Sequence, residues 1–178
     1  MSGGTKEVID FNELPIRSLE DYDKLFELIN KNVIDEQTVY TLKTFLGLNC
    51  SRIVIEYPYN DKDFLSTYYC YYSQKFRGFQ KKCYRLHIMG ESDEYYGYII
   101  LRPTVKGTRL GTAYISPVAL VDEEAYLMLA GFEAHIMDNK QEIMCFPWMK
   151  QEVDISVCAH VAAWTILRYY GTKYHNYA

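Results

Sequence analysis

Two residues near the C-terminal end of the chain have the types and the order of an acyl-transfer site. Gln151 lies a few residues ahead of Cys158, and both Asp154 and Ser156 between them are good helix N-cap residues. This pattern places Cys158 in the first turn of a helix, where free N–H groups and the helix dipole stabilise a thiolate. The amide of Gln151 can then fold back beside the sulfur. Together they would supply a nucleophile and one arm of an oxyanion hole.

The segment that follows Cys158 predicts a helix over about residues 157–170 with almost no polar face. Its apolar residues are Val157, Ala159, Val161, Ala162, Ala163, Trp164, Ile166 and Leu167. A helix that is apolar on all sides is typical of a buried element. Gly171 is expected to end it, with Arg168 in the last turn. Such a helix must pack on the strands, on another chain or on a missing peptidase half.

A buried helix with a cysteine at its open end resembles the papain-like cysteine peptidases. The segments FPWMKQ (146–151) and CAHVAAW (158–164) are similar to bacterial proteins of the bacteriocin-processing-peptidase-like branch. These proteins carry such a peptidase half behind a long N-terminal region, and YGYIILRP (96–103) is similar to a recurring piece of that region. The resemblance is most specific over residues 146–171. One departure is Ala159, where many relatives have glycine.

The resemblance implies a cysteine peptidase that cleaves peptide or isopeptide bonds through an acyl-enzyme. Cys158 would attack the carbonyl, while Gln151 and the Cys158 N–H would hold the oxyanion. Transamidases and acyltransferases use the same machinery. In papain-like enzymes the histidine base and its Asp or Asn partner come from strands well downstream of the helix, whereas this chain ends at Ala178. We therefore expect the chain as given to be catalytically silent, and its enzyme status stays open.

The histidines of the chain do not supply an evident base. His160 lies two positions after Cys158, a rotation of about 200° along a helix, and therefore faces away from the sulfur. The others are expected to be structural or at the surface: His87, His135 and His175. Cys83 and His87 share a strand face, but two ligands do not make a metal site. We expect neither a metal nor another cofactor.

The alternative function is a non-catalytic binding or interaction module in which the peptidase remnant is only scaffold. The segment Lys75–Arg85 interleaves basic residues with Phe76, Phe79 and Tyr84, a pattern that can bind single-stranded nucleic acid. Protective lysines along a solvated hairpin edge explain the same residues and are favoured. The expected partners are a peptide or protein substrate and either a second copy of the chain or the missing C-terminal half.

Composition describes an ordinary globular protein. The 178 residues are 49% hydrophobic and carry a net charge of −4, which gives no general attraction to nucleic acid or to anionic membranes. No apolar run reaches membrane-spanning length, and the polar first residues show no signal peptide. Five cysteines, an odd number without a CxxC pair, favour reduced thiols. We therefore expect a cytoplasmic protein.

The order of elements predicts an α+β fold, with N-terminal helices on an antiparallel sheet and then the first helix of a papain-like half. Helices are predicted over residues 18–29 and 35–46, from a cap at Asp61 or Asp63 to about residue 74, and over 157–170. Strands are predicted over 52–57, 82–89, 95–102, 109–116, 125–137 and 142–146. We divide the chain into an accessory region, 1–142, and the start of a peptidase domain, 143–178.

Overall fold

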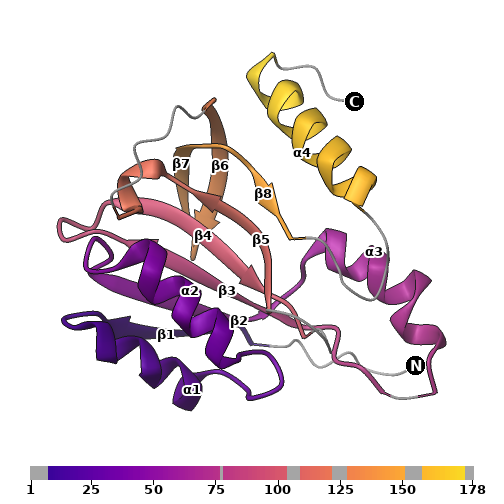
Figure 1. Ribbon diagram of the computed structural model, residues 1–178, viewed down its shortest axis with the longest axis horizontal. Helices are drawn as coiled ribbons and strands as arrows, with labels where there is room; N and C mark the ends of the chain where they lie inside the picture. Colours follow the sequence, from indigo (N-terminus) through magenta and orange to yellow (C-terminus); the bar gives the residue numbers. More distant parts are fainter. Residues whose placement is uncertain (1–7, 77, 104–108, 122–127, 151–157, 175–178) are drawn as a thin grey trace.

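The computed structural model describes residues 8–76, 78–103, 109–121, 128–150 and 158–174. They form an α+β fold around a six-stranded antiparallel sheet with the strand order β1-β2-β3-β4-β5-β8 (Figure 1). The strands of this sheet are β1 (Asp10–Pro15), β2 (Arg52–Tyr59), β3 (Cys83–Met89), β4 (Tyr95–Leu101), β5 (Leu110–Ile115) and β8 (Trp148–Met149). A separate antiparallel hairpin consists of β6 (Ala130–Ile136) and β7 (Asn139–Cys145).

The helices fall into an N-terminal group and three later elements. The N-terminal group comprises the 3-10 helix η1 (Leu19–Lys24), α1 (Leu25–Leu28) and α2 (Glu36–Leu46). The later elements are α3 (Lys62–Cys70) with its 3-10 extension η2 (Tyr72–Gln74), η3 (Pro117–Ala119) and α4 (Cys158–Lys173). Among the described residues, none of these helices combines the length and the hydropathy needed to cross a lipid bilayer.

The N-terminal helices cover one face of the sheet. Asp35 begins α2 as an N-cap, because its carboxylate accepts the backbone N–H of Thr38 at 2.8 Å. Leu42 and Leu46 of α2 then pack into a core with the alternate apolar residues of the central strands. Those strand residues are Ile53 and Ile55 of β2, Leu86 and Ile88 of β3, and Ile99 and Leu101 of β4. This core is the largest in the molecule.

The other face of the sheet is covered by the β6–β7 hairpin, α3 and α4. Tyr114 of β5 packs there with Phe132 and Ile143 of the hairpin and with Tyr169 of α4. Phe64 of α3 forms a neighbouring cluster with residues of β3 and β4. Side chains on this face alternate with those of the first core, so each central strand contributes to both layers. The sheet is therefore the middle of three layers.

Two short strands were missed by the sequence patterns. β1 pairs with β2 through six residues, yet only Leu14 of β1 is buried. An edge strand with one buried position has no apolar alternation to detect. β8 has two residues and joins the sheet through Thr112 and Ala113 of β5. Pairing with a neighbouring strand, rather than local propensity, defines both elements.

The C-terminal helix differs from its prediction in two respects. The expected end at Gly171 is wrong, because α4 continues through this residue to Lys173. The expected burial on all sides is also wrong for the described residues. Tyr169 is 1% exposed, whereas Ile166 is 53% and Leu167 is 61% exposed. The helix packs on one side only. Residue 143, where we place the start of the peptidase domain, lies inside β7 and is paired with β6.

Candidate functional site

The helix predicted to carry the nucleophile is present, and Cys158 lies in it. Cys158 is the first described residue of α4, and the residues directly ahead of it lie outside the described ranges. Free N–H groups and the helix dipole would stabilise a thiolate in a first turn, and this role of Cys158 stays a prediction. Gln151, Asp154 and Ser156 lie outside the described residues. The oxyanion role of Gln151 stays a prediction.

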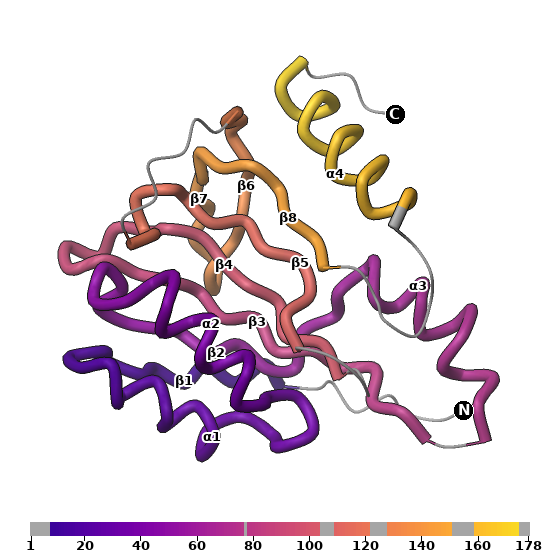
Figure 2. Tube along the Cα trace, viewed as in Figure 1, coloured from indigo at the N-terminus to yellow at the C-terminus, as the bar shows by residue number. Residues whose placement is uncertain are grey.

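α4 is attached to the rest of the molecule along one side, where Trp164 packs against the hairpin-side cluster. Tyr169 packs against Phe146 with ring centroids 5.5 Å apart. The guanidinium of Arg168 donates from Nε to the Tyr114 hydroxyl at 3.2 Å. These contacts connect α4 with the hairpin side of the sheet, where the helix lies near β6 and β8 (Figure 2). They fix the helix axis relative to β5.

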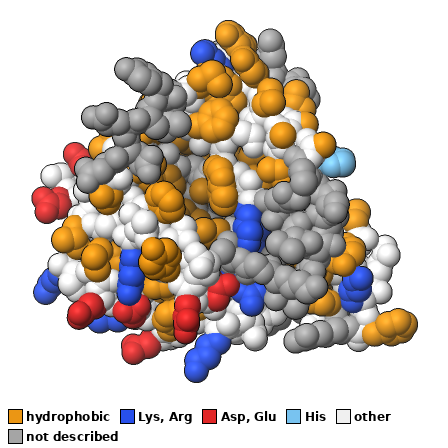
Figure 3. All heavy atoms as spheres, in the orientation of Figure 1, with side chains coloured by type: hydrophobic (Ala, Val, Ile, Leu, Met, Phe, Trp, Pro, Cys, Tyr) orange, Lys and Arg blue, Asp and Glu red, His pale blue; other side chains and the backbone are white. Residues whose placement is uncertain are grey.

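The opposite side of α4 is exposed. Its exposed large apolar residues are Ile166, Leu167 and Tyr170, and the exposed Tyr174 follows directly after the helix. Figure 3 shows hydrophobic side chains gathered over α4 at the top of the molecule, whereas many acidic and basic side chains lie toward the bottom. A helix with this much exposed apolar surface suits a further layer of protein. We call these four residues the open face of α4.

The described histidines lie apart from one another. His160 is exposed on α4, and His135 is exposed on β6. His87 is fully buried on β3. The prediction that His87 is structural is supported by its hydrogen bonds. Its Nε2 donates to Glu56 at 3.0 Å, and its Nδ1 accepts from the Tyr95 hydroxyl at 2.8 Å.

Glu56 is the centre of this buried network. Arg85 donates from Nε to the same carboxylate oxygen at 2.6 Å and reaches the His135 carbonyl oxygen at 2.8 Å. Burial alone would raise the pKa of Glu56, but the hydrogen bond from His87 and the charge of Arg85 lower it overall. Burial lowers the pKa of His87, against the opposing effect of Glu56. The network thus holds a carboxylate, a guanidinium and a neutral imidazole between β2, β3 and the hairpin.

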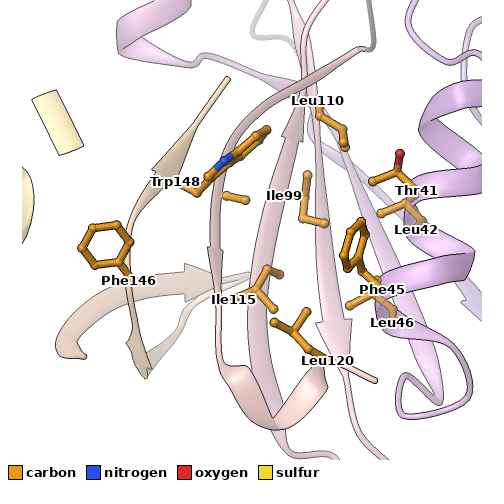
Figure 4. Close-up of a pocket in the computed structure, with 11 residues that line it drawn as sticks. Thr41, Leu42, Phe45, Leu46, Ile99, Leu110, Ile115, Leu120, Phe146 and Trp148 are labelled. Carbon is orange, nitrogen blue, oxygen red and sulfur yellow. The ribbon is translucent and has the colours of Figure 1, made fainter. Parts of the chain in front are cut away.

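An apolar groove lies on the opposite face of the sheet, between α2 and strands β4, β5 and β8. Its volume is about 410 Å³. The groove is lined by Thr41, Leu42, Phe45, Leu46, Ile99, Leu110, Ala113, Ile115, Leu120, Phe146 and Trp148 (Figure 4). The hydroxyl of Thr41 donates to the Gln37 carbonyl within α2. The described lining therefore offers an occupant almost no polar partner.

Sequence reasoning missed this groove because its walls come from distant segments. Phe45 and Leu46 point from α2 toward Ile99 and Ile115 of the sheet (Figure 4). Each of these residues fits an ordinary core pattern when it is considered alone. Nothing in the sequence indicates that the side chains of α2 and those of the sheet leave a space between them. Only the packing distance between helix and sheet opens the groove.

The other described cysteines differ in accessibility. Cys50, Cys83 and Cys145 are buried, and Cys70 is exposed. Burial raises the pKa of the Cys145 thiol to about 12 and also raises that of Cys50. No group of three or more His, Cys, Asp or Glu residues in the described ranges is arranged to hold a metal ion.

The fold places the two ends of the basic segment Lys75–Arg85 in different environments. Arg85 is turned inward, because it is paired with Glu56 and stacks over the Tyr59 ring at 4.4 Å. Lys75 lies over the Tyr71 ring at 4.1 Å, next to the fully exposed Phe76. One of the basic residues that suggested nucleic-acid contact is therefore engaged in the buried network.

Comparisons with known proteins found no match, since no protein-family model, no curated protein and no solved structure is significantly similar to this chain. The candidate site consequently rests on the residues and contacts described above.

Proposed function

We propose that this chain is the N-terminal portion of a papain-like cysteine peptidase, with Cys158 as its nucleophile. The observation that carries the proposal is that Cys158 lies in α4, as its first described residue, shortly after the cap residues Asp154 and Ser156 of the sequence. Free N–H groups and the positive end of the dipole favour a thiolate at this position. Gln151 precedes the helix in the sequence and would donate its amide to the oxyanion.

The open face of α4 also supports this function. In a papain-like domain the nucleophile helix is central and is covered on both sides. Tyr169 and Arg168 attach one side of α4 to the hairpin and β5. Ile166 and Leu167 stay exposed on the other side. A further protein layer over these residues would bury them and close the active site.

In the proposed reaction the thiolate of Cys158 attacks the carbonyl carbon of a peptide or isopeptide bond. The Gln151 amide and the Cys158 N–H stabilise the oxyanion, and a histidine gives its proton to the leaving amine. Water then attacks the thioester, and the thiol is released with the acid product. His87 is committed to Glu56 and Tyr95, so the base would come from outside the described residues.

Alkylation kinetics test the nucleophile directly. The chain is treated with iodoacetamide over a range of pH, and the labelling of each cysteine is followed by mass spectrometry. Cys158 is expected to react at a lower pH and faster than Cys70, the exposed control. Cys50 and Cys145 should react slowly because they are buried and their pKa values are raised. A Cys158 that reacts no faster than Cys70 rules out an activated thiolate.

A second candidate function, a non-catalytic binding module, is favoured by the apolar groove. Its lining suits an aliphatic chain or an apolar side chain of a partner. Trp148 borders the groove and reports on occupancy by fluorescence once Trp164 is replaced by phenylalanine. A medium-chain alcohol should then shift the Trp148 emission in a saturable way. Ala113→Phe, which fills the groove, should abolish the shift; an equal response in both proteins excludes this ligand site.

A further inference from the structure

A second cavity, of about 170 Å³, lies where α3 and α4 approach the sheet. Its strand residues, Tyr98, Ile100, Thr112 and Tyr114, alternate with the residues that line the apolar groove, so the two cavities lie on opposite faces of the sheet. The other lining residues are Tyr59, Asn60, Asp61, Lys62 and Asp63 near the start of α3, and Arg168 of α4. We call this cavity the polar pocket.

A buried ion pair positions one wall of the polar pocket. Arg102 donates from Nε to the Asp61 carboxylate at 2.7 Å and from Nη2 to the Thr112 hydroxyl at 2.8 Å. Asp61 is also the N-cap of α3, where it accepts the backbone N–H of Asp63 at 3.2 Å. Asp61 and Arg102 are 4% and 3% exposed, and their charges balance. The first turn of α3 is thereby held against β4 and β5.

Two further side chains of opposite charge, Asp63 and Arg168, line the same pocket but do not form an ion pair with each other. Asp63 and Arg168 act on each other electrostatically, yet no ion pair within 4.0 Å joins these two described residues. Asp63 is exposed by its accessible surface, yet the surrounding protein and the neighbouring Asp61 raise its pKa, against the hydrogen bond that its carboxylate accepts from Trp164. Arg168 is steadied by its hydrogen bond to the Tyr114 hydroxyl. A carboxylate and a guanidinium therefore border one small space from different helices.

The neutral groups of the pocket leave hydrogen-bonding capacity. Within the described residues, no hydrogen bond engages the Tyr98 hydroxyl or the Asn60 amide. The Tyr98 and Tyr114 rings lie 5.2 Å apart and form an aromatic wall. Aromatic faces attract an ammonium group in addition to its contact with a carboxylate. The lining thus offers partners to both ends of a dipolar ligand.

We propose that the polar pocket binds a small free amino acid, with its ammonium group at Asp63 and its carboxylate at Arg168. A volume of about 170 Å³ is that of roughly six water molecules at about 30 Å³ each, which restricts the ligand to a small molecule. Glycine, alanine and serine are of this size. Charge-assisted hydrogen bonds at both ends would fix the ligand orientation. This inference goes beyond the proposed function and does not depend on Cys158.

Isothermal titration calorimetry with glycine, alanine and serine tests the ligand class. Saturable binding of alanine is expected at micromolar to millimolar concentrations. N-acetylalanine lacks the ammonium group and alaninamide lacks the carboxylate, so each should bind about 10-fold to 100-fold more weakly. Equal binding of N-acetylalanine and alanine overturns the proposal. The absence of saturation with all three amino acids overturns it as well.

Two variants test the assignment of each end. Asp63→Asn should weaken alanine binding and remove the preference for alanine over N-acetylalanine, because the ammonium has lost its carboxylate. Arg168→Gln should remove the preference for alanine over alaninamide. Glu133→Gln changes a carboxylate that pairs with Lys140 on exposed β6, and should leave the affinity unchanged. Circular dichroism checks the fold of each variant.

Asp63→Asn decides the question even if Arg168→Gln does not fold, because Asp63 is on the exposed side of α3. A variant in which alanine binding and the preference for alanine both persist shows that Asp63 is not the ammonium partner. A failure of Cys158 to label rapidly would leave these binding results unaffected. The proposed function and the proposed ligand are therefore tested independently.

Discussion

Glu56 accepts hydrogen bonds from Arg85 and His87 at one carboxylate oxygen, and all three side chains lie on the hairpin side of the sheet. Glu56 is 5% exposed and His87 is 0% exposed. A buried charge network of this kind is stabilising only while every member keeps its partner. Its residues connect β2 with β3, and Arg85 extends it to the hairpin through the His135 carbonyl. Changes at Glu56 should therefore affect several elements together.

We expect Glu56→Gln to lower the free energy of unfolding by about 3–5 kcal/mol, because Arg85 would keep a buried charge without its carboxylate. Urea denaturation followed by circular dichroism measures this change. Glu133→Gln is the matched control. It removes a carboxylate from an exposed ion pair with Lys140 and should change the free energy of unfolding far less than Glu56→Gln does. Equal effects in the two variants would show that the buried network contributes no more than a surface pair.

The same network predicts the direction of the pH dependence of stability. The pKa of buried His87 is lowered in the folded protein, so the unfolded chain binds a proton more readily once the pH falls below about 6.5. The free energy of unfolding should therefore decrease as the pH falls through this range. The lowered pKa of Glu56 extends the loss below about pH 4.3. Arg85, Tyr95 and Tyr98 are the other polar groups that face His87.

Urea denaturation of the unmodified chain and of His87→Gln at a series of pH values checks this prediction. The decrease of stability between about pH 7 and pH 5 should be smaller in the variant, because glutamine does not take up a proton. A stability that rises with acidification in the unmodified chain would contradict the neutral state of His87.

At the scale of elements, α4 combines a well-packed side with an open one. Two adjacent tyrosines belong to different sides of the helix, since Tyr169 is 1% exposed and Tyr170 is 46% exposed. Tyr169 packs on Phe146, whereas Tyr170 stacks on Tyr174 directly after the end of the helix. The attachment of α4 to the hairpin therefore depends on only a few side chains.

We expect Tyr169→Ala to detach α4 or to cost about 3–5 kcal/mol, as is typical when a buried aromatic side chain is truncated. Tyr170→Ala should cost much less. Hydrogen exchange of the α4 amides measures the attachment of the helix, and Trp164 emission reports the exposure of its packed side. If both variants exchange at the same rate, the packing of α4 against the hairpin is not what holds the helix.

At the scale of the whole molecule, the open face of α4 predicts self-association of this chain. Ile166 and Leu167 present adjacent apolar side chains to solvent. We expect dimers or larger species in multi-angle light scattering, with a mass that rises with protein concentration. Leu167→Lys should shift the equilibrium toward the monomer. Leu19→Lys, at another exposed leucine, should not. A monomer at every concentration would show that the open face needs no cover.

Local sequence signals predicted the helices and strands whose formation depends on residues close in the sequence. Asp35 as N-cap and the apolar spacing after it predicted α2, and the alternation in 52–57 predicted most of β2. The capping pattern ahead of Cys158 predicted a helix there, and Cys158 lies in α4. The same local reasoning failed at Gly171, because the last turn of α4 continues past this residue, with Lys173 bonded back to the buried Tyr169.

Tertiary structure alone decided which residues meet. Strand register places His87 beside Glu56, and the approach of α3 to α4 puts Asp63 and Arg168 on one pocket. Neither pair is close in the sequence, so no local pattern connects its members. The apolar composition of α4 also did not predict which surface would cover the helix, because hydrophobicity favours burial without specifying a partner. The free energy of a buried charge or an apolar face depends on the surface opposite, and only the packed layers supply that surface.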